Sequence, residues 1–224
     1  GDQGALQHAL AELQASSHRL VQAGALLPAA CLLNEQAAIY MRLGDLVRAT
    51  YLLSQAHERF EHHLRQYPQD TMALEDLAGT KHLAARLPLH VQVPPGYEEA
   101  SYAQGLAHAQ AAEAIYQRLG QQRPLTHVWE TMGRLALQRG ELAVAQERLT
   151  AAFELQRQLG DVAGLARSTA ALAELCMRAG QLDQAVALLA HSITLNFDKG
   201  SPIGLAFNRH TLGAQTCRDR KRRR

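Results

Sequence analysis

The sequence predicts an all-α protein, built as an α-solenoid of stacked antiparallel helix hairpins. The first observation is compositional: the 224 residues are 47% hydrophobic but only 5% aromatic, with seven prolines, which favours helix over sheet. The second is a 40-residue period, visible in Gly140 and Gly180, each followed by a polar residue and then leucine. The third is the helical spacing of apolar residues between the glycines.

The period extends over much of the chain. LeuGly at 119–120, LeuGlyAsp at 159–161 and LysGly at 199–200 are 40 residues apart, and a GlyAspLeu turn stands at 44–46. In the first half of the chain, helices are expected over 3–23, 27–43, 45–66 and 70–87.

A proline-rich stretch, 88–96, interrupts the repeat. Pro94 and Pro95 cannot lie inside a helix. The spacing from Gly44 to Gly140 exceeds two periods by 16 residues, so this stretch is predicted to be an extended loop inserted in place of a tight turn.

In the second half, apolar and small residues from Val128 to Arg139 mark one helix face, and Gly140 follows in a C-cap position. A second stripe, 142–159, ends at Gly160. Connections of one to four residues force neighbouring helices to run antiparallel. The predicted helices here are 97–119, 124–139, 141–159, 161–179, 181–197 and 202–217.

Three units of the chain repeat one set of small and apolar residues at matching positions. These residues are Ala37, Tyr40, Gly44, Ala49, Leu53 and Ala56; Trp129, Met132, Gly133, Ala136, Ala145, Leu149 and Ala152; and Leu172, Ala173, Cys176, Gly180, Ala185, Leu189 and Ser192. They resemble the tetratricopeptide repeat (TPR) family, whose pattern is Trp-x2-Leu-Gly-x2-Tyr followed by Ala-x3-Phe, Ala and Pro. The match is degenerate at 70–112 and incomplete at 202–217. The period of 40, longer than the family's usual 34, resembles the variants in Pins/LGN-type adaptors, kinesin light chains and bacterial peptide-sensing regulators.

The resemblance implies a right-handed superhelix in which Gly133 and Ala145 lie where the two helices of one hairpin cross. A larger side chain there would force the helices apart. The predicted organisation is a single solenoid over 1–217 with the inserted loop at 88–96, followed by a basic tail, 218–224, expected to be disordered.

The charge is divided unevenly between these parts. The formal net charge is +2, but the tail carries six positive charges and one negative, which leaves residues 1–217 at −3. A basic nucleic-acid-binding surface on the folded part is therefore not expected. The tail itself could bind nucleic acid, anionic lipid or an import receptor, or be a disordered end.

The resemblance also implies a scaffold or adaptor that binds a peptide or partner protein in a groove lined by first helices. Arginine recurs among the groove candidates, and its planar fork suits carboxylates, so a partner with acidic groups is expected. The alternative is that these charges only keep helix surfaces soluble. The candidate groove residues are Asn34, Glu35, Arg42, His127, Glu130, Arg134, Gln138, Arg167, Glu174, Arg178 and His210.

Neither catalysis nor a cofactor is expected. The phosphate-binding and nucleophile motifs GxGxxG, GxxxxGK[ST] and GxSxG do not occur. The histidine-rich segment 57–63 resembles a zinc-protease helix but has Glu61 where the second histidine of HExxH is needed. It is predicted to be a solvated polar helix face, with His57/Glu61 and Glu58/His62 as helical neighbours and no metal.

Three widely spaced cysteines give no disulfide framework, which favours a reducing compartment such as the cytoplasm. The longest apolar run is too short to span a membrane.

A sensing module of a regulatory protein, in which a bound peptide or ligand changes solenoid curvature, is a second possible function. Self-association through the unpaired helix 202–217 is also possible.

Overall fold

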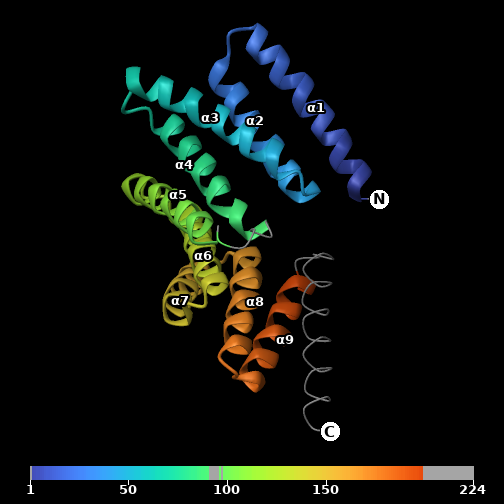
Figure 1. The fold of residues 1–224 in the computed structure, drawn as a ribbon, viewed down its shortest axis with the longest axis vertical. Helices are drawn as coiled ribbons and strands as arrows, with labels where there is room; N and C mark the ends of the chain where they lie inside the picture. Colours follow the sequence, from blue (N-terminus) through green and yellow to red (C-terminus); the bar gives the residue numbers. More distant parts are fainter. Residues whose placement is uncertain (1, 91–95, 97, 199–224) are drawn as a thin grey trace. The chain divides into compact units, whose positions relative to one another are not determined.

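The computed structural model describes residues 2–90, 96 and 98–198, and all regular structure in these residues is helical (Figure 1). The elements are α1 (Asp2–Gln22), α2 (Leu26–Leu43), α3 (Leu46–Gln66), α4 (Thr71–Arg86), the 3₁₀ helix η1 (Leu87–His90), α5 (Glu98–Leu119), α6 (Gln122–Arg139), α7 (Leu142–Gln158), α8 (Val162–Arg178) and α9 (Leu182–Asp198).

Nine predicted helices fall within the described residues, and each is found with its ends displaced by at most two residues. The largest difference is at α6, which begins at Gln122 rather than 124. Pro124 is accommodated because it lies in the first turn, where its missing N–H has no helical partner. The predicted helix 202–217, with the self-association assigned to it, and the tail 218–224 lie outside the described residues.

The helix ends follow from local sequence. Gly44 closes α2 in the left-handed region at a φ of 81°, where a side chain would be strained. Asp45 then caps α3 by accepting the backbone N–H of Arg48 at 3.0 Å. Asp161 caps α8 in the same way through Gly164. A glycine stop followed by an aspartate start therefore produces a turn of only two residues.

The helices group into two compact units. Unit 1 is Gly1–Gln121 and contains α1 to α5 with η1, and unit 2 is Gln122–Arg224 and contains α6 to α9. The organisation of 1–217 as one continuous solenoid stays a prediction.

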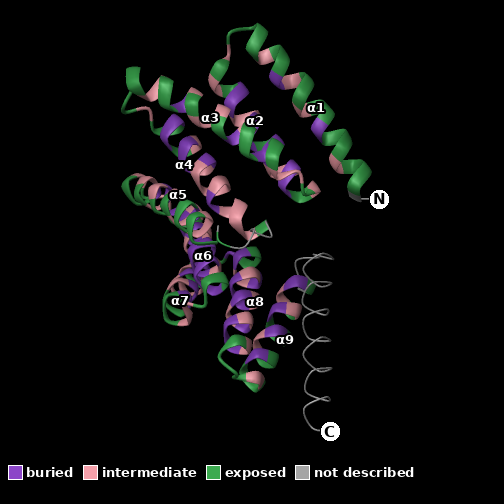
Figure 2. Ribbon diagram, viewed as in Figure 1, coloured by how far each residue is buried: buried purple, intermediate pink, exposed green. Residues whose placement is uncertain are grey.

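Unit 1 consists of two hairpins, α2–α3 and α4–α5, with α1 packed against α2 and α3 against α4. Its core includes Phe60, which is fully buried among Ala56, Leu33 and Leu77. Figure 2 shows the buried residues as stripes along α2, α3 and α4, interrupted by exposed positions. Stripes of this kind are what amphipathic helices present to a common core.

Unit 2 consists of the hairpins α6–α7 and α8–α9, joined by packing of α7 on α8. Its core includes Leu137, Leu149 and Leu175. The predicted crossing at Gly133 is confirmed: a Cβ placed on Gly133 would lie 2.6 Å from Leu149 Cγ and 3.4 Å from the Ala145 carbonyl oxygen. The predicted fold class, an all-α stack of helix hairpins, is confirmed.

The predicted loop needs a correction. Residues 88–90 are not extended but belong to the 3₁₀ helix η1, which continues from the end of α4 and packs against α3, α4 and α5. Residues 91–95 lie outside the described part of the chain. No helix among the described residues combines the length and apolar character needed to cross a membrane.

Candidate functional site

Two first helices of unit 2, α6 and α8, contact each other and carry seven of the predicted groove residues. Five of these residues form two ion-paired groups on the two helices, one around Glu130 and the other between Glu174 and Arg178, and we call the five together the arginine cluster. Its members are Arg134, Arg167, Arg178, Glu130 and Glu174.

Glu130 is the centre of the cluster. Its side chain is only 7% exposed, although it was predicted to be an exposed groove residue. Arg167 Nε on α8 donates to Glu130 Oε2 at 3.1 Å, and Arg134 Nη1 lies 3.8 Å from Oε1. The prediction of exposure is wrong here because a buried carboxylate is stable only when paired, and two neighbouring guanidinium groups supply the pairing.

Arg178 makes one hydrogen bond to α6 and another within its own helix, α8. One guanidinium nitrogen donates to the backbone carbonyl of Leu137 near the end of α6, and the other donates to Glu174 Oε1 at 2.9 Å. The Leu137 carbonyl also accepts the backbone N–H of Gly140 at 3.0 Å, and a cation at the C-terminal end of a helix is favourable. Arg178 therefore fastens the end of α6 to α8.

The arginine cluster has exposed N–H donors that are available to a ligand. The side chains of Arg134, Arg167 and Arg178 are 42%, 41% and 41% exposed. With two glutamates against three arginines, the cluster has one excess positive charge. Within the described residues Arg134 has only its 3.8 Å ion pair and no hydrogen bond, so most of its five N–H donors are available to a ligand.

His127 belongs to a neighbouring polar group. Its Nε2 lies 3.2 Å from Oδ2 of Asp161, whose side chain is 8% exposed. Burial by itself raises the pKa of Asp161. The backbone N–H of Gly164, followed by His127 and Arg167, outweighs burial and holds this pKa below its usual value.

The remaining groove candidates are dispersed. Glu35, Arg42 and Gln138 are exposed, as predicted. Asn34 is buried, which corrects the prediction: its amide nitrogen donates to Thr80 Oγ1 at 2.9 Å, and the Thr80 hydroxyl donates back to Asn34 Oδ1 at 3.1 Å. Asn34 therefore connects α2 to α4. His210 lies outside the described residues.

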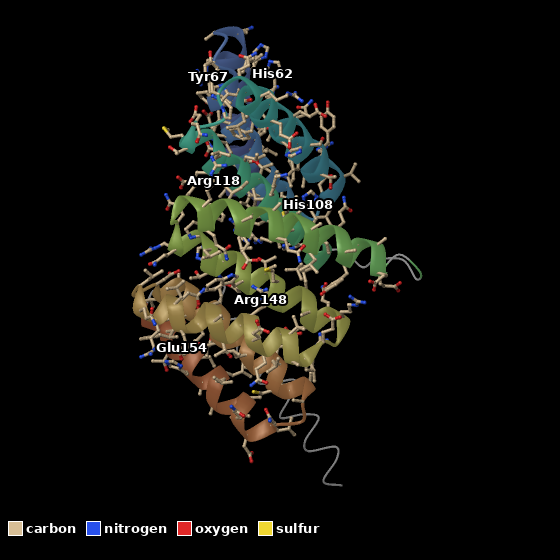
Figure 3. The ribbon with its side chains drawn as sticks, turned by 90° about the vertical axis from the view of Figure 1, so that its left-hand side faces the viewer. His62, Tyr67, His108, Arg118, Arg148 and Glu154 are labelled. Atoms are coloured by element: carbon tan, nitrogen blue, oxygen red, sulfur yellow. The ribbon has the colours of Figure 1, made fainter. Side chains whose placement is uncertain are left out.

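The segment 57–63 is only partly the solvated face that was predicted. His57 Nε2 lies 3.3 Å from Glu61 Oε1, which agrees with the predicted helical pairing, but the His57 side chain is half-buried. His63 is also half-buried and bonds the N-cap residue Asp70 at 2.8 Å. His62 is exposed (Figure 3). Among the described residues, no group of three or more His, Cys, Asp or Glu is placed to hold a metal ion.

Unit 2 also contains a buried polar network that the sequence analysis did not predict. The Ser168 hydroxyl donates to Gln156 Oε1 at 2.6 Å, and Gln156 Nε2 lies 3.4 Å from Thr126 Oγ1, so the three side chains connect α6, α7 and α8. Gln156 is fully buried. The sequence feature that could have indicated this network is Gln156 itself, a glutamine at an otherwise apolar position of the α7 stripe.

The sequence matches no protein-family model and no curated protein. Among solved structures, the chain is similar to aspartyl phosphate phosphatase F from Bacillus subtilis, with a TM-score of 0.69 and 13% identity over 88% of this chain and 48% of that one. It is also similar to BtubC from P. vanneervenii, with a TM-score of 0.51 and 15% identity over 88% and 91% of the two chains.

At these identities the likeness concerns the fold alone. It supports a helical-repeat fold. The chain spans about half the length of the phosphatase. Membership of the TPR family itself stays a prediction.

Proposed function

We propose that this protein is an interaction module in which the arginine cluster of α6 and α8 binds a carboxylate-bearing segment of a partner protein. The observation that carries the proposal is the arrangement around Glu130. One buried carboxylate positions two arginines from successive first helices, and both keep about two fifths of their side-chain surface exposed.

This arrangement suits an acidic ligand for two reasons. Guanidinium groups bind carboxylates through paired, charge-assisted hydrogen bonds, and Arg134 has donors to offer. The hydrogen bond to Glu130 also restricts Arg167 before a ligand arrives, which reduces the entropy lost on binding. We propose a binding role rather than a catalytic one, in a reducing compartment such as the cytoplasm.

The alternative predicted from the sequence, a ligand-sensing module, is favoured by a different observation. Unit 1 contains a cavity of about 340 Å³ between α3, α4 and α5. The residues of this cavity are separate from those of the arginine cluster.

A random peptide library displayed on phage tests the arginine cluster directly. Selection on the full chain is expected to enrich peptides containing aspartate, glutamate or a free C-terminal carboxylate. Arg134→Gln removes the charge with most unused donors but keeps a polar side chain, and it is expected to abolish that enrichment.

Arg157→Gln is the matched control, because Arg157 lies on the second helix α7, is 64% exposed and pairs only locally with Glu154. It should select the same acidic peptides as the unaltered chain. If the selected peptides are no more acidic than the starting library, or if Arg134→Gln selects them equally well, the arginine cluster does not bind carboxylates.

A further inference from the structure

The cavity in unit 1 is formed by three helices that do not close completely. α4 packs against both α3 and α5, and η1 contributes Leu87 and Pro88 to the wall. The volume of about 340 Å³ falls within the usual range of small-molecule sites. The cavity belongs to unit 1 alone and is independent of the arginine cluster.

Two similar stripes face the cavity from opposite helices. On α3 the stripe ends in His57 and includes Ser54; on α5 it ends in His108 and includes Ser101 and Gly105. Residues spaced by three, four and seven positions lie on one helix face. Because serine and glycine are small, these stripes leave room between the helices that larger side chains would occupy.

Lys81 on α4 lines the cavity between these stripes. It is half-buried and makes no hydrogen bond or ion pair with any described residue. It is also the sole lysine in the described ranges, where all other long cations are arginines. Since no described side chain pairs with the ammonium group of Lys81, this group is available to an anion that enters the cavity.

The two histidines that line the cavity, His57 and His108, are both influenced by Lys81. Burial first, and then the nearby positive charge of Lys81, lower the pKa of both His57 and His108. Neutral imidazole rings, each with one N–H, are therefore favoured. His57 Nε2 already lies 3.3 Å from Glu61 Oε1, so His108 is the ring that can donate its N–H to a ligand. The acidic groups near His57 are Glu58 and Glu61 on its own helix. Lys81 is thus the principal charge in the cavity, which suits a ligand with a single negative charge.

We propose that this cavity binds a small organic monocarboxylate, with its carboxylate at Lys81 between His57 and His108 and its apolar body against Leu53 and Ala84. The cavity walls support this placement of the apolar body, since Leu53 is buried and Ala84 and Leu87 are half-buried. A metal cation is not the expected ligand, because the ammonium group of Lys81 would repel it.

Hexanoate is the probe, and hexanamide, which has the same chain without the charge, is the matched ligand control. Each is titrated into the full ¹⁵N-labelled chain and followed by amide chemical shifts. Hexanoate should shift signals of α3, α4 and α5 around the cavity, and hexanamide should bind about tenfold more weakly, as expected for the loss of a charge-assisted hydrogen bond.

Lys81→Met keeps the aliphatic stem and should weaken hexanoate binding by about tenfold. Arg118→Met is its control: it removes a positive charge from another part of α5 (Figure 3), where Arg118 contacts Gln69 outside the cavity. This variant should bind hexanoate normally. Ser101→Phe, which fills the cavity but keeps Lys81, should abolish binding, so the test does not depend on one variant folding.

Three results would overturn the proposal. They are equal affinity for hexanoate and hexanamide, unchanged hexanoate affinity in folded Lys81→Met, and shifts confined to α6 and α8 or missing altogether. Shifts at α6 and α8 would assign the carboxylate to the arginine cluster instead. The peptide selection is independent of this titration, since its variants alter unit 2 only.

Discussion

Gly133 controls how closely α6 approaches α7. A Cβ at this position would lie 2.6 and 2.8 Å from two carbons of the Leu149 side chain, which is fully buried and cannot move away freely. The tetratricopeptide-like pattern predicted this approach because small residues recur where hairpin helices cross.

Gly133→Ala is therefore expected to lower the free energy of unfolding by about 1–3 kcal/mol, the usual cost of overpacking a core. Equilibrium urea unfolding followed by circular dichroism measures it. Gly4→Ala is the control, since Gly4 lies in α1 with no atom within 4 Å of a Cβ built there. Leu149→Ala is itself destabilising because Leu149 is fully buried, but in its background Gly133→Ala should cost less than in the unaltered chain. An equal cost in both backgrounds would mean that the contact with Leu149 is not the cause.

Asp161 makes a pH-dependent contribution to stability. Its pKa is lower in the folded chain than its ordinary value. The carboxylate therefore stabilises the fold above the unfolded pKa of about 4, and this contribution disappears as the pH falls through the lower folded pKa. Asp161→Asn keeps a good N-cap residue but loses the charge.

The expected result is that Asp161→Asn is less stable than the unaltered chain at pH 7, and that the difference narrows toward pH 3. Denaturant unfolding at both pH values measures it. Asp183→Asn, an exposed change in the first turn of α9, should have little effect at either pH. A difference that stays constant with pH would show that the Asp161 charge does not matter.

The burial and the partners of individual polar side chains were the features hardest to predict from the sequence. Asn34 and Glu130 lie on first helices, and their sequence context does not distinguish an exposed side chain from one that bridges two helices. Their burial depends on Thr80 and Arg167, which are 46 and 37 residues away in the chain. Lys81 and His108 were missed for the same reason, because a cavity requires knowledge of how α3, α4 and α5 face one another.

At the scale of elements, the contact between α6 and α8 depends on a charged pair rather than on apolar packing alone. Arg167→Gln would leave the buried carboxylate of Glu130 with only Arg134 at 3.8 Å. We expect a loss of about 1–2 kcal/mol, below the cost of breaking a fully buried pair because both arginines are half-exposed.

Adding Glu130→Gln to Arg167→Gln should recover part of this stability, because the double variant no longer buries an unpaired charge. Thermal unfolding of Arg167→Gln, Glu130→Gln and the double variant measures the coupling free energy between these two side chains. Strictly additive effects would mean that the 3.1 Å contact contributes nothing to stability.

The helices themselves were well predicted because their signals are local. Apolar spacing identifies each buried stripe, and glycine and aspartate mark the ends, as Gly44 and Asp45 do between α2 and α3. Residues 88–90 were the exception. Proline in this stretch suggested an extended chain, but Pro88 is compatible with the 3₁₀ helix η1, since its fixed φ lies in the helical range.

At the scale of the whole molecule, the described apolar cores lie within one unit or the other. Phe60 and Leu77 belong to a core of unit 1, and Leu137 and Leu149 to one of unit 2. In repeat proteins stability is a sum of local terms and nearest-neighbour contacts, so damage in one repeat need not reach distant ones.

Amide hydrogen exchange on the Gly133→Ala variant tests this expectation. Protection should fall most in α6 and α7 and least in α1 to α3, since the clash with Leu149 lies within unit 2. A uniform loss of protection across α1 to α9 would instead indicate that the described helices unfold as one cooperative body.

The turn glycines have a consequence for how such a chain can change its length. Gly120, Gly140, Gly160 and Gly180 all have positive φ and follow one another every 20 residues. An in-frame duplication or deletion of one complete hairpin would preserve the stop signal and buried stripe of every remaining helix. Loss of a single helix would reverse the direction of all helices that follow. Heritable length variation is therefore expected in steps of whole hairpins.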